Sequence, residues 1–121
     1  MLEAWLDYHR ATLLMKCEGL SDDELKRRAA EPSTLSLLGL VRHLTDVERG
    51  WFRRSVGGEK GPEVGPIYYS DDRPEDDFEA LDDLEPAAVF IAYRDELERC
   101  RDAAAGVPLD EVAGDRSVRW I

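Results

Sequence analysis

Residues 36–54, with the sequence SLLGLVRHLTDVERGWFRR, carry the strongest helical pattern in the chain. Apolar side chains recur there at three- and four-residue steps, as they do along one face of an amphipathic helix. The members of this predicted apolar face are Leu37, Leu40, Val41, Leu44, Val47, Trp51 and Phe52. Four charged side chains are expected to lie away from it, namely Arg42, Asp46, Arg49 and Arg53. The stretch therefore predicts a long helix with one face in a core.

Two other long helices and a short one are predicted around this stretch. Leu2, Leu6, His9, Leu13 and Cys17 form a stripe of helical period, which indicates a first helix ending at the glycine of position 19. A short helix over about residues 22–29 follows, because a serine and a glutamate three positions apart form a capping box at positions 21 and 24. The third long helix begins near position 86, where a proline suits the first turn, and ends before position 106.

Composition places the chain in a broad class before any motif is considered. Its 121 residues and 13.7 kDa suit one domain, predicted over residues 1–121. With 27 acidic against 16 basic residues the formal charge is −11, which argues against nucleic acids and anionic membrane surfaces as partners. No apolar run suits a membrane span or a signal peptide, and two cysteines are too few for a disulfide scaffold. We therefore expect a cytoplasmic protein.

The elements together predict an all-α fold, an antiparallel up-down four-helix bundle. No segment alternates with a period of two over the length of a strand. Ser117 resembles the N-cap of another helix, and the sequence reaches Ile121 one turn later. We therefore expect the last helix of the bundle to be truncated in these 121 residues, which would leave one side of the core uncovered.

An acidic stretch separates the second and third long helices. Residues 70–85 contain nine Asp and Glu side chains, with a few apolar residues between them. Such charge runs are usually solvated, so a loop or a short acidic helical turn is the first interpretation. A cation-binding loop is the alternative, although the regular acid spacing of a calcium loop is missing.

His43 is the first candidate for a functional site. It lies between Leu40 and Val47 at three- and four-residue spacing, so it is expected at the interior or the rim of the bundle. An imidazole there needs partners for both nitrogens, which a carboxylate, a carbonyl or a metal ion can supply. His9 is a weaker candidate, for which packing or hydrogen bonding is the favoured interpretation. Glu48 is five residues from His43, and we expect it to form an ion pair instead.

The cysteines and tryptophans are given structural roles. Cys17 and Cys100 each lie on an apolar stripe, where thiols usually act as small hydrophobic side chains. Trp5, Trp51 and Trp120 are spaced as anchors of a core. Two histidines without paired cysteines do not complete the three protein ligands of a usual catalytic zinc site.

Two segments carry a resemblance to a known family. Residues 16–25, KCEGLSDDEL, and residues 36–52, which contain VRHLTDVERGWF, resemble the DinB/YfiT-like superfamily of four-helix metalloenzymes, and specifically an actinobacterial branch of it. The acidic segment after Tyr68 and the closing residues 117–121 also fit, so the resemblance covers nearly the whole chain.

The resemblance implies a divalent metal, zinc or nickel, held by a histidine of the second long helix and by two ligands of the last helix. His43 matches the first ligand, and the other two have no counterpart in the sequence. Members of the superfamily include transferases of low-molecular-weight thiols and a mycothiol-dependent isomerase. A metal-bound thiol loses its proton at neutral pH, which suits such chemistry.

Two functions follow as hypotheses. The first is a metal-dependent thiol S-transferase or hydrolase, in which His43 holds part of the metal and a low-molecular-weight thiol such as mycothiol is a partner. The alternative is a non-catalytic helical module for oligomerisation or the stress response, without bound metal. In either case we expect a homodimer that forms through the face which the last helix would cover.

Overall fold

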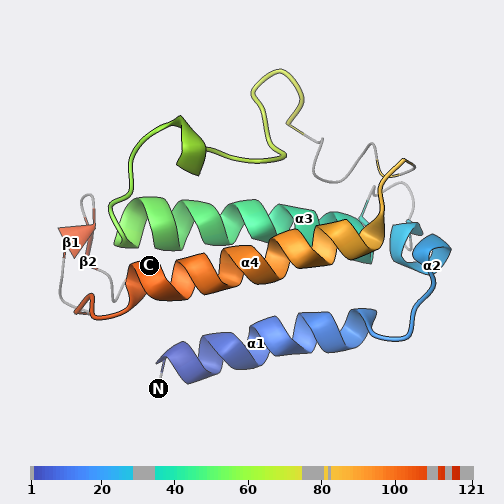
Figure 1. Ribbon diagram of the computed structural model, residues 1–121, viewed down its shortest axis with the longest axis horizontal. Coiled ribbons are helices and arrows are strands. Elements are labelled where there is room, and N and C mark those ends of the chain that lie inside the picture. The colour runs from blue at the N-terminus through green and yellow to red at the C-terminus, as the bar shows by residue number, and fades with distance from the viewer. Residues whose placement is uncertain are drawn as a thin grey trace.

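The computed structural model describes residues 2–28, 35–74, 81, 83–108, 112–113 and 116–117. Its long helices are α1 (Leu2–Cys17), α3 (Leu37–Glu48), which continues as the π-helix η1 (Arg49–Val56), and α4 (Pro86–Ala104). The short elements are α2 (Asp22–Lys26), the 3₁₀ turn η2 (Pro62–Val64) and the two-residue strands β1 (Val112–Ala113) and β2 (Arg116–Ser117). Figure 1 shows the three long helices side by side, with α2 across one end. The all-α prediction is confirmed.

Local sequence signals fix most helix ends where they were predicted. Gly19 has a φ of 79° after α1, a left-handed conformation that glycine adopts without the steric cost of a Cβ. The capping box is present, since the Ser21 hydroxyl accepts from the Glu24 amide and the Glu24 carboxylate accepts from the Ser21 amide. The helix that it begins ends at Lys26, three residues earlier than expected.

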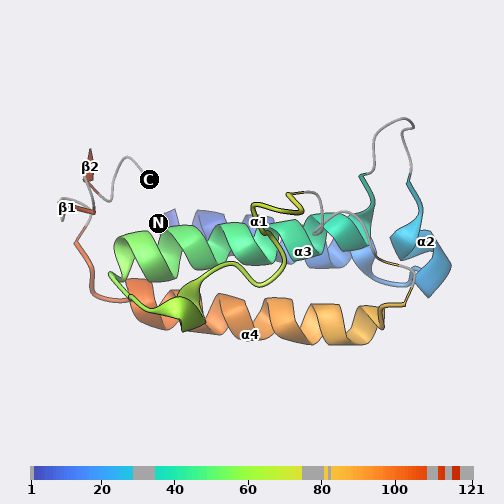
Figure 2. The same cartoon turned by 90° about the horizontal axis from the view of Figure 1, so that it is seen from above.

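The directions of the long helices differ from a simple alternation. α1 runs antiparallel to both other long helices (Figure 1), and the contacts of Arg10 with Glu48 and of Asp7 with Arg101 link it to them. α3 and α4 instead run parallel, because the connection between them returns along the length of the bundle (Figure 2). This connection passes over η1 and α3 and provides one wall of the site described below.

The core lies between α1, α3 and α4, and Leu25 of α2 closes one end of it. Its buried side chains include Leu38 and Val41 of α3 and Tyr93 and Leu97 of α4. Tyr93 is 1 % exposed, and burial raises the pKa of its phenol to about 12. The core is therefore formed mainly by α3 and α4, with α1 contributing the thiol of Cys17 and partly buried leucines.

The predicted apolar face of residues 36–54 is wrong in one respect. Leu37, Leu40, Leu44 and Val47 are only half-buried and Trp51 is 48 % exposed. Another set of side chains turns inward, made up of Leu38, Val41, Arg42, Thr45, Glu48, Arg49 and Arg53. The charged members of this set can be buried because most of them pair with opposite charges on α1 and α4, which offsets their loss of hydration.

The same correction applies to α1. His9 was expected on the inward stripe and Trp5 as an anchor of the core, but both are exposed, while the charged side chain of Arg10 is only 6 % exposed. His9 packs edge-on against the rings of Trp5 and Tyr8, a surface aromatic cluster in agreement with the packing role expected for it. Two of the three tryptophans are thus not core anchors, and Trp120 lies outside the described residues.

The end of the chain differs from the predicted start of a helix. Ser117 belongs to β2, which pairs antiparallel with β1 in the register Val112 with Ser117 and Ala113 with Arg116. The sequence between the strands is Gly114-Asp115, a dipeptide typical of two-residue hairpin loops, so this ladder had a local signal that helical periodicity does not detect. Among the described helices, none has the length and apolar character needed to cross a membrane.

Candidate functional site

His43 lies at the edge of the helix layer and not in the core. At ~100° per residue its side chain leaves α3 about 160° away from those of Val41 and Thr45, which are both fully buried. It is half-buried, and it shares its face of α3 with Asp46, Val47 and Gly50. The expected position at the interior or rim is therefore the rim, on the side opposite the described core.

A segment of the long connection is tied down beside this face. Asp46 accepts hydrogen bonds from three successive backbone amides, those of Ile67, Tyr68 and Tyr69, at 2.7, 2.9 and 3.0 Å. The Arg42 guanidinium lies over the Tyr68 ring, 4.5 Å from its centroid. One carboxylate thus occupies both of its oxygens in holding the backbone of residues 67–69 against α3.

Two arginines of η1 hold the preceding part of the same connection. Arg49 donates through Nε to the Gly65 carbonyl at 2.8 Å and through a terminal nitrogen to the Glu63 carbonyl. Arg53 forms two hydrogen bonds with the Glu59 carboxylate, at 3.0 and 3.3 Å. These contacts anchor residues 59–65 to η1 and fix their distance from the helix.

Both arginines also reach inward to one carboxylate of α4. Glu96 is 2 % exposed and accepts from Arg49 at 2.8 Å and from Arg53 at 3.0 Å. Hydrogen bonds with Glu59 and Glu96 raise the pKa of Arg53 above its usual range, so the guanidinium stays charged. The buried pairs therefore join α4, η1 and the connection into one supported unit.

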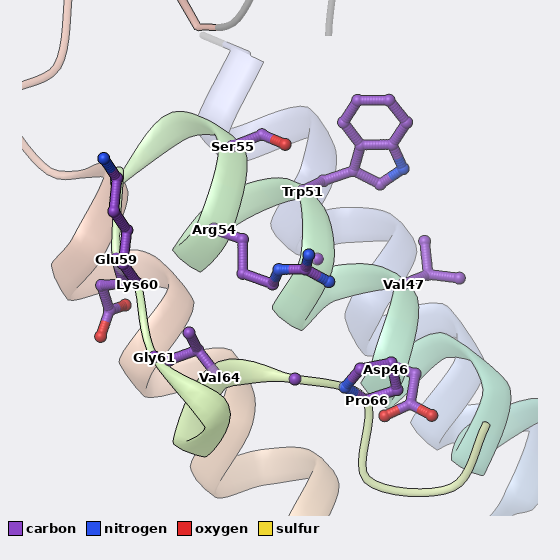
Figure 3. Close-up of a pocket in the computed structure, with 12 residues that line it drawn as sticks. Asp46, Val47, Trp51, Arg54, Ser55, Glu59, Lys60, Gly61, Val64 and Pro66 are labelled. Carbon is purple, nitrogen blue, oxygen red and sulfur yellow. The ribbon is translucent and has the colours of Figure 1, made fainter. Parts of the chain in front are cut away.

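Between η1 and this anchored connection lies a cleft of about 740 Å³ (Figure 3). α3 and η1 supply one wall with Asp46, Val47, Gly50, Trp51, Arg54 and Ser55. The connection supplies the other wall with residues 59–61 and 64–66. Since Asp46, Val47 and Gly50 share the face of His43, the cleft begins about one helical turn from that histidine.

The described residues do not form a complete metal site. No group of three or more His, Cys, Asp or Glu side chains able to hold an ion occurs among them. Glu48 is paired with Arg10, as predicted, and His9 belongs to the aromatic cluster on α1. The two cysteines are buried and free, as expected for structural thiols. Burial raises the pKa of the Cys17 thiol, and it raises the pKa of the Cys100 thiol to about 12.

The acidic stretch is described only in part. Residues 70–74, 83 and 85 are exposed and belong to loops and turns, as the first interpretation of this stretch predicts. Residues 75–80 and 82 lie outside the described residues. The cation-binding alternative has no support in the part of the stretch that the structure describes.

Sequence reasoning missed the residues that support the cleft. Arg49 and Arg53 are four residues apart on one helix face, and this spacing could have indicated a shared acidic partner. The partner, Glu96, is far along the chain and gives no local signal. The role of Asp46 was equally hidden, because its three amide donors belong to an irregular segment.

Comparison with known proteins adds one finding. A family model described as mycothiol-S-transferase matches residues 1–121, the whole of the sequence. No curated protein and no solved structure was found to match the chain. The family lies within the DinB/YfiT-like superfamily that the residues themselves resemble. The chain therefore belongs to the mycothiol-S-transferase family.

Proposed function

We propose that this protein attaches mycothiol through its sulfur to an electrophilic substrate and that His43 belongs to its catalytic site. The observation that carries the proposal is the match of the family model, which extends over residues 1–121 and so includes His43 and the cleft beside it. The position of His43 supports its role, because a half-buried imidazole next to an open cleft is within reach of a small molecule.

The reaction that this function requires is a substitution or addition at carbon. The thiol gives up its proton to a base such as water, and its sulfur forms a bond to an electrophilic carbon. In a substitution the leaving group departs with the bonding electron pair, and in an addition the electron pair of the opened multiple bond takes up a proton. Neither cysteine of the chain suits the role of nucleophile, since both thiols are buried and their raised pKa keeps them protonated. The nucleophilic sulfur is therefore that of the small thiol.

The family resemblance implies a divalent metal such as zinc or nickel, and the described residues fit it only in part. His43 is a suitable donor, but a catalytic zinc site needs three protein ligands, and no such group exists in the ranges that the structure describes. Asp46 and Glu48 already use their carboxylates on backbone amides and on Arg10. We therefore propose His43 as one ligand and derive no step of the reaction through a metal ion.

Metal content tests this role of His43 directly. The full gene product would be purified without an affinity tag that binds metal, and its zinc and nickel content measured by mass spectrometry. We expect about one ion per chain in the wild type and in the His9→Ala variant, because His9 is an exposed residue of the aromatic cluster. His43→Ala should lose the ion while keeping the helical circular dichroism of the wild type. Equal metal content in His43→Ala and His9→Ala would refute the assignment.

One observation favours the alternative, a non-catalytic module that associates with itself. A groove of about 630 Å³ lies between α1 and α4 and is lined mainly by apolar side chains, with Met15 and Ile91 about 60 % exposed. Glu18 and Arg94 also line it. Opposite charges in one groove can pair with their copies across a two-fold axis, so the occupant proposed here is a second copy of the chain.

Sedimentation equilibrium tests this association. The wild type should sediment as a dimer, and Met15→Glu should shift it toward the monomer without loss of helicity, because a charge in an apolar interface is costly. Glu3→Gln, also on α1 but outside this groove, is the matched control. A wild type that stays monomeric at ~100 µM would exclude the homodimer and leave the S-transferase proposal untouched.

A further inference from the structure

The cleft between η1 and the connection has an unusual balance of charge for this protein. The chain as a whole carries a formal charge of −11, but the cleft contains two basic side chains, Arg54 and Lys60, against two acidic ones, Asp46 and Glu59. A ligand can bind only to those of the four groups that have no partner within the protein, and the acidic and basic groups differ in this respect.

Both acidic groups of the cleft are engaged. The two oxygens of Asp46 accept from the amides of residues 67–69, and the two oxygens of Glu59 accept from the Arg53 guanidinium. These carboxylates therefore have donors at both oxygens within the protein. The negative charge of each carboxylate is already stabilised by these donors, so neither is well placed to bind a cation.

Both basic groups are available. Neither the Arg54 nor the Lys60 side chain makes a hydrogen bond or an ion pair in the ranges that the structure describes, and both residues are exposed. Figure 3 shows the Arg54 side chain within the cleft, between Trp51 and Val64, while Lys60 stands on the opposite wall and extends away from it. An arginine without a partner in a concave site is suited to bind a carboxylate or a phosphate through two parallel hydrogen bonds.

The rest of the lining suits an organic body attached to that anionic group. Val47, Trp51 and Val64 are apolar members of the cleft lining. Gly50 lies on the helical wall, and a Cβ built on it would have no atom within 4 Å, so the space above it is open. The cleft thus combines the Arg54 guanidinium with apolar lining residues and open space next to Gly50.

We propose that this cleft binds a small organic anion, with the Arg54 guanidinium holding its carboxylate or phosphate group and Trp51 and the valines contacting its apolar part. The cleft begins about one turn from His43 and Arg54 lies about three turns from it, so we take the electrophilic substrate of the transferase to be an elongated anion that extends from Arg54 toward His43. This last assignment rests on the proposed function, whereas the binding site does not.

Binding can be measured without thiol, metal or turnover. The amide signals of Gly50 and Ser55 would be followed by nuclear magnetic resonance while the protein is titrated with benzoate, phenyl phosphate or the uncharged benzamide at low ionic strength. We expect saturable shifts with an anion and at least tenfold weaker binding of benzamide. Whichever anion binds more tightly shows whether a carboxylate or a phosphate is the preferred group.

Three variants separate the roles of charge and space. Arg54→Gln should weaken anion binding about tenfold, the scale of a lost charge-assisted hydrogen bond, and leave benzamide binding unchanged. Gly50→Leu should weaken binding of all three probes, because the leucine side chain would occupy the open space next to position 50. Arg28→Gln, an exposed arginine outside both this cleft and the α1–α4 groove, should bind as the wild type does.

Several results would overturn the proposal. These are equal affinity for benzoate and benzamide, anion binding by Arg54→Gln within twofold of the wild type, and no saturable shift up to ~50 mM of either anion. If anions bind as expected and acidic electrophiles react no faster than neutral ones of similar reactivity, the site stands and its assignment to the electrophile fails. If no thiol transfer occurs at all, the proposed function fails while the binding results still decide the site.

Discussion

Arg10 of α1 and Glu48 of α3 form an ion pair inside the molecule, with an Nε–Oε1 distance of 2.9 Å and exposed fractions of 6 % and 8 %. A second contact between the guanidinium and Oε2 makes the pair bidentate. The backbones of α1 and α3 are not closely packed, so these long side chains bridge the gap that shorter apolar ones would leave open.

The buried pair should be costly to break and cheaper to remove completely. Arg10→Met leaves the Glu48 carboxylate buried without its main partner, and we expect a loss of about 3 kcal/mol in the free energy of unfolding. The double variant Arg10→Met, Glu48→Met should recover at least half of that loss, since no charge is stranded. Urea unfolding at pH 7 measures both, with Arg28→Met as an exposed control. A double variant as unstable as Arg10→Met would contradict this account.

The cysteines should be unreactive in the folded protein. Burial raises the pKa of the Cys17 thiol and raises that of Cys100 to about 12, so the thiolate that reacts with iodoacetamide is scarce at pH 8. We expect alkylation of both thiols only as fast as the protein unfolds, and complete alkylation within minutes in 6 M guanidinium chloride. Mass spectrometry at timed intervals gives the two rates. Fast modification of Cys100 under native conditions would show that the thiol is accessible.

The anchoring of residues 59–65 should weaken in acid. Hydrogen bonds from Arg53 lower the pKa of Glu59 below the ordinary value of a glutamate, 4.5. Because the folded pKa is depressed, this contribution to stability is complete above pH ~4.5 and is lost as the pH falls through the folded value. Glu59→Gln should therefore be less stable than the wild type at pH 7, and the difference should shrink below pH ~4.5. A difference that stays constant from pH 7 to pH 3 would exclude the proposed linkage.

Two glycines of the same helical region should respond in opposite ways to a methyl group. Gly50→Ala should stabilise the protein by ~0.5 kcal/mol, because its Cβ meets no atom within 4 Å and alanine loses less backbone entropy in a helix. Gly57→Ala should destabilise it by ~1–3 kcal/mol, because the Cβ would lie 2.9 Å from the Arg53 carbonyl oxygen and from the Ala103 side chain. Thermal unfolding of both variants checks the signs, and a stabilising Gly57→Ala would be incompatible with this packing.

Much of the fold was predictable because helix ends depend on short-range chemistry. The capping box at Ser21, the left-handed glycine at position 19 and the proline at position 86 each act within one turn, and each was found where predicted. The parallel course of α3 and α4 was not predictable from such signals. It depends on a connection whose course is set by contacts such as those of Asp46 with the amides of residues 67–69.

The inward face of residues 36–54 was misjudged for a related reason. Periodicity assigns the core to apolar side chains, but Arg49 and Glu48 become inward residues once Glu96 and Arg10 are opposite them. Their partners are more than 35 positions away, so no local pattern reveals them. Because these charged side chains face inward, His43 lies at the rim, next to the cleft. That His43 has a role at a site stays a prediction, and its position at the rim is one of the two that were expected.

Thiol transfer by His43 variants tests the central proposal most directly. The consumption of mycothiol with an activated aryl halide would be followed spectroscopically for the full gene product, with His43→Ala and His9→Ala compared at equal protein concentration and confirmed helicity. We predict that His43→Ala lowers kcat/KM at least 100-fold while His9→Ala stays within twofold of the wild type. Thiol transfer by His43→Ala at the wild-type rate, or its absence in the wild type, would contradict the account.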